Sequence, residues 1–406
     1  MKSDSYTQRV RLNYAYAFFK DFAFFSAVLV PFFTQWGGIS LVQVQLLQSW
    51  FSLWVFVLEV PTGAIADKIG RKHSIALGSL VVSLAVILYG SIPRYEVFLL
   101  SEFLFAVGYA LSSGADQALL YDTLKEEGRE EESVTILGRA NSFHLLGMLI
   151  AAPIGGIIAS RFGISAPILA SSIPFFIAAI VGWSIPEPKI HTGESQTPRY
   201  GDIVRKGLSV LRTNPWVRTL AIDSVLVAAS AYFVIWFYQP LLTQLGVPIL
   251  YFGFAHALCL VAQILISSHF PTLEKLIGSG TRYLRVSALA TAASFILVAA
   301  YPHVITVILF LLIAGGVGLT RATYIVSLAN ASIPSRERAT VLSSIQMIRR
   351  LALVILNPFV GWTADYSLRL ALFLVGLLPL GTFVFSSIEE RKTSKLNSTL
   401  LHRSVE

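Results

Sequence analysis

Long hydrophobic runs separated by short polar breaks dominate the chain. Reading the runs against the breaks predicts six membrane-spanning helices on each side of a polar stretch over 186–214. A spanning α-helix needs about 20 mostly apolar residues, which each run with its flanks supplies. The predicted spans cover residues 12–36, 41–66, 71–91, 95–124, 135–159, 164–185, 216–242, 249–272, 282–301, 303–331, 338–361 and 367–388.

The polar stretch is the only long linker in this pattern, and it predicts two domains. We expect an N-terminal six-helix bundle over 1–190, a linker over 191–215, a C-terminal six-helix bundle over 216–390 and a tail over 391–406.

Three local matches relate the two halves at separations of 205 to 210 residues. Chance recurrence of Pro and Gly, which are frequent in membrane helices, is the alternative explanation. A match seven residues long favours duplication of a six-helix unit. The matched pairs are Pro31 to Gly37 with Pro240 to Gly246, Pro61-Thr62 with Pro271-Thr272, and Pro153 to Gly156 with Pro358 to Gly361.

Composition agrees with a membrane protein. The 406 residues are 55% hydrophobic and 13% charged, with a mean hydropathy of +0.68. Ordinary soluble domains carry about 25% charged residues. The single cysteine, Cys259, excludes an intramolecular disulfide and a thiol metal cluster. The net charge of +8 follows membrane topology and does not indicate nucleic-acid binding.

Basic residues fix the predicted orientation. Only seven of the 31 lie in spans or on the side opposite the N-terminus, so 24 share the N-terminal side. The positive-inside rule therefore places both termini and the linker in the cytoplasm. The first run holds Lys20 and Asp21 and is too long for a signal peptide, so we interpret it as the first span. The seven exceptions are Arg94, Arg161, Arg369, Lys20, Arg321, Arg349 and Arg350.

The loop between the second and third spans reads Gly63-Ala-Ile-Ala-Asp67-Lys-Ile-Gly70-Arg71-Lys72. A glycine at 63 permits close helix approach, Asp67 and Arg71 are spaced to pair, and Gly70 breaks the helix. A plain turn with basic residues is the alternative. The loop closely resembles the cytoplasmic signature of the major facilitator superfamily, and with the twelve spans, linker and duplication the resemblance covers essentially the whole chain.

Further strings look like the bacterial efflux-type members of that superfamily. They include Glu59 to Gly63, Gly114 to Asp122 and Arg338 to Ser343. The resemblance implies an all-α major facilitator fold of two pseudo-symmetric bundles, and it implies that Asp67, Arg71 and Asp122 hold a cytoplasmic gate shut.

The chain also departs from the drug–proton antiporter branch. Leu104 stands where that branch has an Arg four residues before a Gly, and the fifth-span pattern begins with Ala152 rather than Gly. The loop from Pro271 to Gly278 keeps little of the signature. The coupling ion and the substrate are therefore left open.

Charges inside the membrane are expensive and default to functional candidates. In the first half the candidates for proton coupling are Asp21, Glu59, Glu102 and Asp116. Asp21 ranks first, because the adjacent Lys20 points about 100° away on a helix and pairs poorly with it. Glu59 is equally compatible with a gate contact, and Glu102 and Asp116 with burial beside a hydrogen-bonding partner.

In the second half Arg321 is the main candidate for binding a substrate anion. The alternative is a fixed salt bridge to a first-half acid. Arg349 and Arg350 are further candidates, and Phe22 and Trp236 represent aromatic clusters that suit a planar or amphiphilic ligand. Hydrogen-bonded packing roles are favoured for His144, His256 and His269, and no metal site or cofactor is expected.

These observations predict a proton-coupled exporter of a small organic molecule that works by alternating access. A uniporter or importer of a small organic anion is the first alternative. A membrane-embedded sensor or enzyme is the second, although no nucleophile–base set, nucleotide loop or output domain supports it. We expect a monomer in the cytoplasmic (inner) membrane, with protons, lipid and a small molecule as partners and no nucleic acid.

Overall fold

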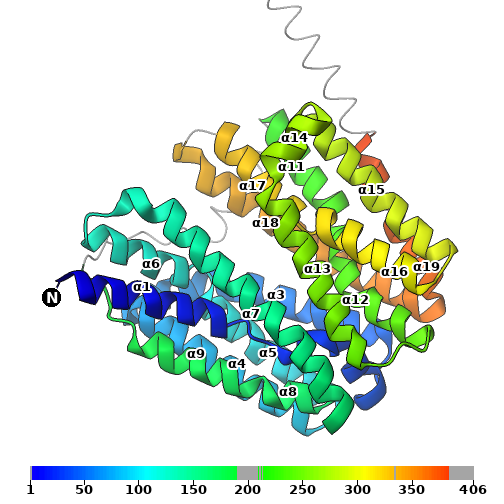
Figure 1. Cartoon of the computed structure of the whole chain (residues 1–406), viewed down its shortest axis with the longest axis horizontal. Coiled ribbons are helices and arrows are strands. Elements are labelled where there is room, and N and C mark those ends of the chain that lie inside the picture. The colour runs from blue at the N-terminus through cyan, green and yellow to red at the C-terminus, as the bar shows by residue number, and fades with distance from the viewer. Residues whose placement is uncertain (1, 190–208, 210–211, 213, 333–334, 384–406) are drawn as a thin grey trace, which may run out of the picture. The chain divides into compact units, whose positions relative to one another are not determined.

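The computed structural model describes residues 2–189, 209, 212, 214–332 and 335–383. All regular structure among these residues is helical (Figure 1). Ten helices are long and apolar enough to cross a membrane. A bent pair, Tyr6–Ala27 with Leu29–Trp36, supplies an eleventh span, and Leu368–Phe383 is a shorter apolar helix. The predicted all-α membrane fold is confirmed, with ten or eleven spans meeting these criteria rather than twelve.

Contacts divide the chain into two compact units. Unit 1 comprises Met1–Tyr200, Leu242–Val261 and Val354–Asp365, and unit 2 comprises Gly201–Leu241, Ala262–Leu353 and Tyr366–Glu406. The predicted division into two bundles stays a prediction, and most of the predicted linker and the whole tail lie outside the described residues.

Unit 1 contains the helices of the first half together with parts of three later helices. A buried cluster that includes Tyr16, Ile75, Leu119 and Ala178 forms part of its core. The elements are α1 (Lys2–Phe19), η1 (Phe24–Ala27), α2 (Leu29–Pro31), η2 (Phe32–Trp36), α3 (Leu41–Ile69), α4 (Arg71–Ser91), α5 (Tyr95–Ser112), α6 (Ala115–Glu126), η3 (Glu130–Glu132), α7 (Ser133–Phe162), α8 (Ala166–Ala170) and α9 (Ser172–Ser184).

Unit 2 is built from later helices, and α12, α13 and α18 are divided between the units. Val217, Leu220, Ile325 and Val341 belong to a buried cluster of unit 2. The elements are α11 (Pro215–Asp223), η4 (Ser224–Ala228), α12 (Ala229–Gln244), α13 (Leu250–Ser268), α14 (Phe270–Ile277), α15 (Gly280–Ala300), α16 (Val304–Phe310), η5 (Leu311–Gly318), α17 (Arg321–Ser332), α18 (Ser335–Tyr366), α19 (Leu368–Leu377) and η6 (Leu378–Leu380).

Candidate functional site

The first span is broken in the middle. α1 ends at Phe19, and Lys20 to Ala23 form a non-helical turn before η1 begins. The helical segments on the two sides of Val28 are bent by 60°. Discontinuous helices inside a membrane are tolerated where they line a cavity or are buried in protein, and in transporters they commonly form the binding site. The sequence had predicted one continuous span here.

The fourth span is broken as well, close to the break in the first. α5 ends at Ser112, and Gly114 adopts φ +77° before α6 begins at Ala115. This left-handed conformation suits glycine, because it has no Cβ. Asp116 therefore lies in the first turn of a new helix, where its Oδ1 accepts from the N–H of Gln117 at 2.7 Å.

Small residues on α7 support the broken first span. Gly147, Ala151 and Gly155 recur every four residues and are all buried. A Cβ at Gly147 would clash with the carbonyl oxygen of Phe18, and one at Gly155 with that of Phe24. Small residues at four-residue spacing let backbones approach closely in membranes. The glycines thus allow α7 to pack against the chain on both sides of the break.

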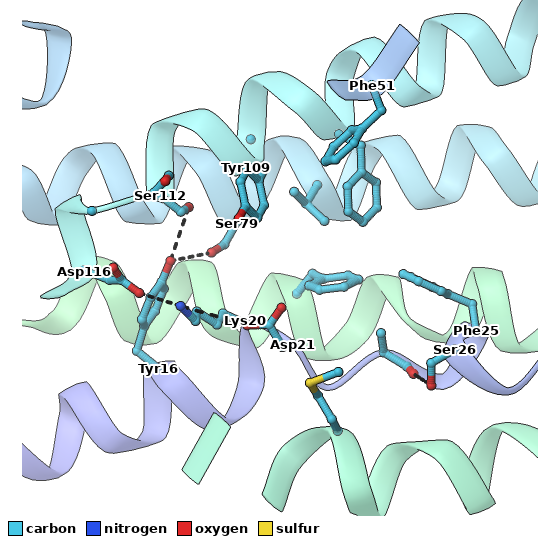
Figure 2. A pocket seen from close by; sticks show the side chains of 18 of the residues that line it. Tyr16, Lys20, Asp21, Phe25, Ser26, Phe51, Ser79, Tyr109, Ser112 and Asp116 are labelled. Carbon is cyan, nitrogen blue, oxygen red and sulfur yellow. Dashed lines mark hydrogen bonds and ion pairs between the residues drawn. The ribbon is translucent and has the colours of Figure 1, made fainter. Parts of the chain in front are cut away.

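A pocket of about 450 Å³ opens at these breaks within unit 1 (Figure 2). Tyr16, Lys20, Asp21 and Asp116 lie together at one end of it. Phenylalanines occupy the other end, so the pocket is polar at one end and aromatic at the other. The apolar lining comprises Phe25, Phe51, Val82, Phe105, Met148 and Phe175. A second pocket of about 410 Å³ shares the polar end and reaches Asn13, Asn141 and His144.

Two charge pairs organise the polar end. The ammonium of Lys20 forms an ion pair with Asp116 across the two breaks. Asp21 Oδ2 lies 2.9 Å from His144 Nδ1 and 3.9 Å from Lys20 Nζ. The close partners of Lys20 and Asp21 are therefore on other helices, as the poor geometry of adjacent residues suggested. A hydrogen-bonded packing role was predicted for His144, and Asp21 is its partner in this hydrogen bond.

Tyr16 fixes the wall beside this cluster. Its side chain is 2% exposed, and its hydroxyl lies 3.2 Å from Ser79 Oγ and 3.4 Å from both Ser112 Oγ and Ile75 O. The phenol therefore connects α1 with α4 and α5 directly beside Lys20. Sequence reasoning did not select Tyr16, since a tyrosine in an apolar helix carries no distinguishing signal.

The charged side chains at the polar end do not balance. Asp21 and Asp116 are two acids and Lys20 is one base, so the carboxylates outnumber the ammonium groups around this pocket.

The other predicted proton-coupling residues lie outside this pocket. Glu102 is 7% exposed on α5 and accepts a hydrogen bond from Gln48 Nε2 at 2.9 Å. Glu59 is exposed on α3. The structure therefore brings together Asp21 and Asp116 of the four candidate acids.

Arg321 pairs with an acid of its own unit. The sequence had predicted either a substrate anion or an acid of the first half as its partner. Its guanidinium is 1% exposed and binds both carboxylate oxygens of Asp223, with Nε to Oδ2 at 2.6 Å. It also donates to Ser287 and, at 2.7 Å, to the carbonyl oxygen of Leu284. The expected first-half partner is thus wrong: Arg321 is satisfied within unit 2.

The remaining binding candidates are scattered. Phe22 is half-buried beside Phe18 and Phe24, with ring centroids 5.1 and 5.3 Å away. Trp236 is buried in α12, and Arg349 and Arg350 are half-buried on α18 within unit 2.

The predicted gate loop forms an ion pair between two of the three residues expected in its charge cluster. Gly70 adopts φ +96° and separates α3 from α4, and Arg71 pairs with the buried Asp122. Asp67 lies exposed near the end of α3. The close approach expected at Gly63 is not seen, because no atom among the described residues lies within 4 Å of a Cβ built there.

An acid that sequence reasoning missed completes the loop. The Glu187 carboxylate accepts from the backbone N–H groups of Arg71 and Lys72, at 2.8 and 2.9 Å. It thereby caps the start of α4, where a negative charge also meets the positive end of the helix dipole.

A family model described as Major Facilitator Superfamily matches residues 12–356. The chain belongs to this superfamily. Its family and structural neighbours are membrane transporters and not enzymes.

Individual relatives are distant. The staphyloferrin B transporter of Staphylococcus aureus (strain NCTC 8325 / PS 47) is 27% identical over 233 residues, which cover 54% of this chain and 53% of that protein. The multidrug resistance protein 2 of Bacillus subtilis (strain 168) is 32% identical over 120 residues, which cover 29% of this chain and 28% of that protein. This superfamily member therefore matches about half the length of the first relative, and less of the second.

Solved structures share the fold. The nucleoside transporter NupG aligns with a TM-score of 0.76 at 12% identity, covering 93% of this chain and 98% of that one. A bacterial homolog of the human lysosomal transporter Spinster, in an inward-facing and occupied conformation, aligns with a TM-score of 0.74 at 17% identity, covering 95% and 96%. At these identities the likeness establishes the fold alone.

Proposed function

We propose that this superfamily member is a secondary active transporter that exports a small organic molecule by alternating access, coupled to protons. The observation that carries the proposal is the charged turn Lys20–Asp21, which lies at a break in the first span and faces a pocket with an aromatic end. Charges at this depth are costly unless they serve binding or ion movement.

The charge balance of the pocket favours a cationic or zwitterionic substrate. The one net negative charge at neutral His144 attracts an ammonium group, and the phenylalanines of the other end suit an apolar or planar body. Binding of the cation at Asp21 and protonation of the Asp21–His144 pair then compete. This competition couples the exit of substrate to the entry of a proton, because the empty site returns in its protonated form.

An importer or uniporter of an organic anion has less support. The basic second half was the reason to consider an anion, and its most buried arginine, Arg321, already holds the carboxylate of Asp223. Lys20 in the pocket is likewise paired, with Asp116. Neither cation is available to a substrate anion without displacing a carboxylate.

Export and membrane orientation are inferred from features of the sequence. The local resemblance to efflux-type members includes the multidrug resistance protein 2 of Bacillus subtilis (strain 168). The positive-inside rule places the Gly63–Lys72 loop and both termini in the cytoplasm, and we propose a location in the cytoplasmic membrane. The Arg71–Asp122 pair is proposed to close the cytoplasmic side in the outward-facing state.

The test is a flux measurement on purified protein in liposomes under an imposed pH gradient. Pools of cationic, neutral and anionic compounds are added while internal pH is recorded. Coupled export predicts proton movement that appears only with cationic or zwitterionic pools and opposes substrate movement. Substrate movement that ignores the gradient would contradict proton coupling and favour a uniporter, and proton flux with anionic pools alone would favour the anion alternative.

A further inference from the structure

A second pocket of about 410 Å³ continues from the charged cluster of the first pocket, within unit 1. The two pockets share Lys20, Asp21 and Asp116. α7 runs along both pockets, because its Met148 lines the first and its His144, one turn earlier, lines the second. The charged cluster thus lies between the aromatic end of the first pocket and a second space on its other side.

The second space is lined by amides instead of phenylalanines. Its walls include the side-chain amides of Asn13, Gln117 and Asn141, and none of the described residues that line it is a phenylalanine. Apolar side chains, among them Ala17 and Leu137, also line it. We call this space, from the charged cluster to Asn13 and Asn141, the amide pocket. Because an amide both donates and accepts, this wall suits an uncharged chain that makes hydrogen bonds.

Asn13 and Asn141 lie at nearly the same level of the amide pocket, on two neighbouring helices. α1 and α7 run in the same direction, because successive glycines of α7 meet successive carbonyl groups of the first span. The rings of Tyr14 and Phe143 stack with centroids 5.0 Å apart, which sets the register between the two helices. Asn13 precedes Tyr14 by one residue and Asn141 precedes Phe143 by two, so the two amides flank the pocket at one height.

These amides have hydrogen-bonding capacity that the described part of the protein does not use. Asn13 is 5% exposed, and its Nδ2 donates to the carbonyl oxygen of Arg9 at 2.9 Å. This bond fixes the amide and leaves its Oδ1 with no donor among the described residues. The side chains of Gln117 and Asn141 likewise make no hydrogen bond to another described residue. Buried polar groups in proteins are normally paired, and a fixed acceptor that faces a pocket is suited to a donor on a ligand.

We propose that the amide pocket binds an uncharged, hydrogen-bonding tail of the substrate. The substrate is then an amine whose nitrogen carries an apolar or aromatic body on one side and an amide- or hydroxyl-bearing chain on the other. This inference rests on the proposed function, which places the ammonium group at Asp21. Asn13 Oδ1 accepts from the tail, and the amide of Asn141 donates to it. Asn141 lies about 5 Å along α7 from His144, so a chain of three carbons reaches it.

The test is equilibrium binding of three related amines to the purified protein, measured by titration calorimetry. Phenethylamine carries the aromatic body and the ammonium group alone. Its N-carbamoylpropyl derivative adds an amide tail on three carbons, and its N-isohexyl derivative adds an apolar tail of the same shape. Because both tailed amines are secondary amines with the same charge, the ratio of their affinities reports the tail alone. The measurement depends on neither transport nor proton movement.

The wild type is expected to bind the amide-tailed amine more tightly than the isohexyl amine, because the apolar tail leaves Asn13 and Asn141 without partners. Asn141→Leu is expected to lower this affinity ratio about tenfold, the value of one net hydrogen bond, while the affinity for phenethylamine stays unchanged. Thr135→Val is the matched control, since Thr135 is exposed on the same helix and does not line the amide pocket. This control should keep the wild-type ratio.

A wild-type ratio that favours the isohexyl amine would overturn the inference, because the amide pocket would then act as an apolar subsite. An unchanged ratio in Asn141→Leu would also overturn it, since the tail would lie elsewhere. The proposed function fails on different results. Phenethylamine that does not bind contradicts a cationic substrate and both proposals with it. Tailed amines that bind with the expected ratios but move without proton flux contradict proton coupling and leave the amide pocket standing.

Discussion

The ammonium of Lys20 and the carboxylate of Asp116 form an ion pair between two broken spans. Lys20 begins the turn after α1, and Asp116 lies in the first turn of α6. The pair thus holds two irregular backbone segments together at the polar end of the pocket. Both side chains are partly buried, at 25% and 17% exposed, so the pair is less screened than a surface ion pair.

Breaking this pair should reduce stability in a non-additive way. Lys20→Met or Asp116→Asn leaves one charge unpaired, which we expect to cost about 1–2 kcal/mol. The double variant should cost clearly less than the sum of the two single changes, since residues in contact are coupled. The thermal unfolding midpoint of the purified protein measures all three. Strictly additive shifts would show that the pair is not formed.

The glycines of α7 give a prediction with a control on the same helix. Gly155→Ala places a methyl group against the carbonyl oxygen of Phe24 and should displace the broken span, at a cost of about 1–3 kcal/mol and with loss of transport. Gly138→Ala meets no atom within 4 Å among the described residues, so it should be neutral or slightly stabilising. Equal thermal midpoints for the two variants would contradict the packing described here.

The Arg321–Asp223 ion pair is expected to stabilise the folded protein. Asp223→Asn removes one charge from a fully buried pair, and we expect a loss of about 3–5 kcal/mol. Replacing both residues, as Asp223→Leu with Arg321→Met, should restore much of that stability, because no buried charge is left alone. The thermal unfolding midpoints of Asp223→Asn and of the double variant measure this difference in stability. A double variant less stable than Asp223→Asn would contradict a structural role for the ion pair.

Loss of the Glu187 carboxylate, which caps the start of α4, is expected to lower stability less than the changes above. Glu187→Gln weakens the charged cap on α4 and should lower stability by about 1 kcal/mol. Glu130→Gln, an exposed acid on η3, is the matched control and should have no measurable effect. Limited proteolysis at the loop and the thermal midpoint report the difference. Identical behaviour of the two variants would mean that the cap contributes nothing.

The sequence predicted the fold class because its signal is repeated in every span. Breaks inside spans were missed, since Lys20 to Ala23 and Gly114 are too short to interrupt a hydrophobic run of that length. The break in the first span packs against α7, and a hydropathy pattern does not report such packing. The four-residue spacing of Gly147, Ala151 and Gly155 was a signal for that packing, and it was available in the sequence.

The candidate site was predicted in part, and the internal repeat explains one error. Asp21 and Asp116 were selected from their depth alone, and both line the pocket. Arg321 was expected to meet a first-half acid. An offset of 205 residues instead equates it with Asp116, so a first-span residue of its own half, Asp223, is the natural partner. Each half thus has an ion pair between its first and fourth spans, Lys20–Asp116 and Asp223–Arg321, with acid and base exchanged between the two spans.

The two ion pairs differ in solvent exposure, and we expect them to have different roles. Arg321 is 1% exposed and sits between helices, while Lys20 and Asp116 face a cavity. The second-half pair is therefore suited to fixing helices and the first-half pair to contact with a substrate. Depth and residue type do not distinguish these cases in a sequence, because burial is set by the packing of neighbouring helices.

The central claim is that Asp21, beside His144 in the pocket, couples substrate movement to protons. The most direct measurement is substrate-dependent proton flux in liposomes containing the wild type, Asp21→Asn, or Glu96→Gln, the last being an exposed acid at the start of α5. We expect flux in the wild type and in Glu96→Gln, and none in folded Asp21→Asn. Asp21→Asn with the wild-type ratio of protons to substrate would contradict the account.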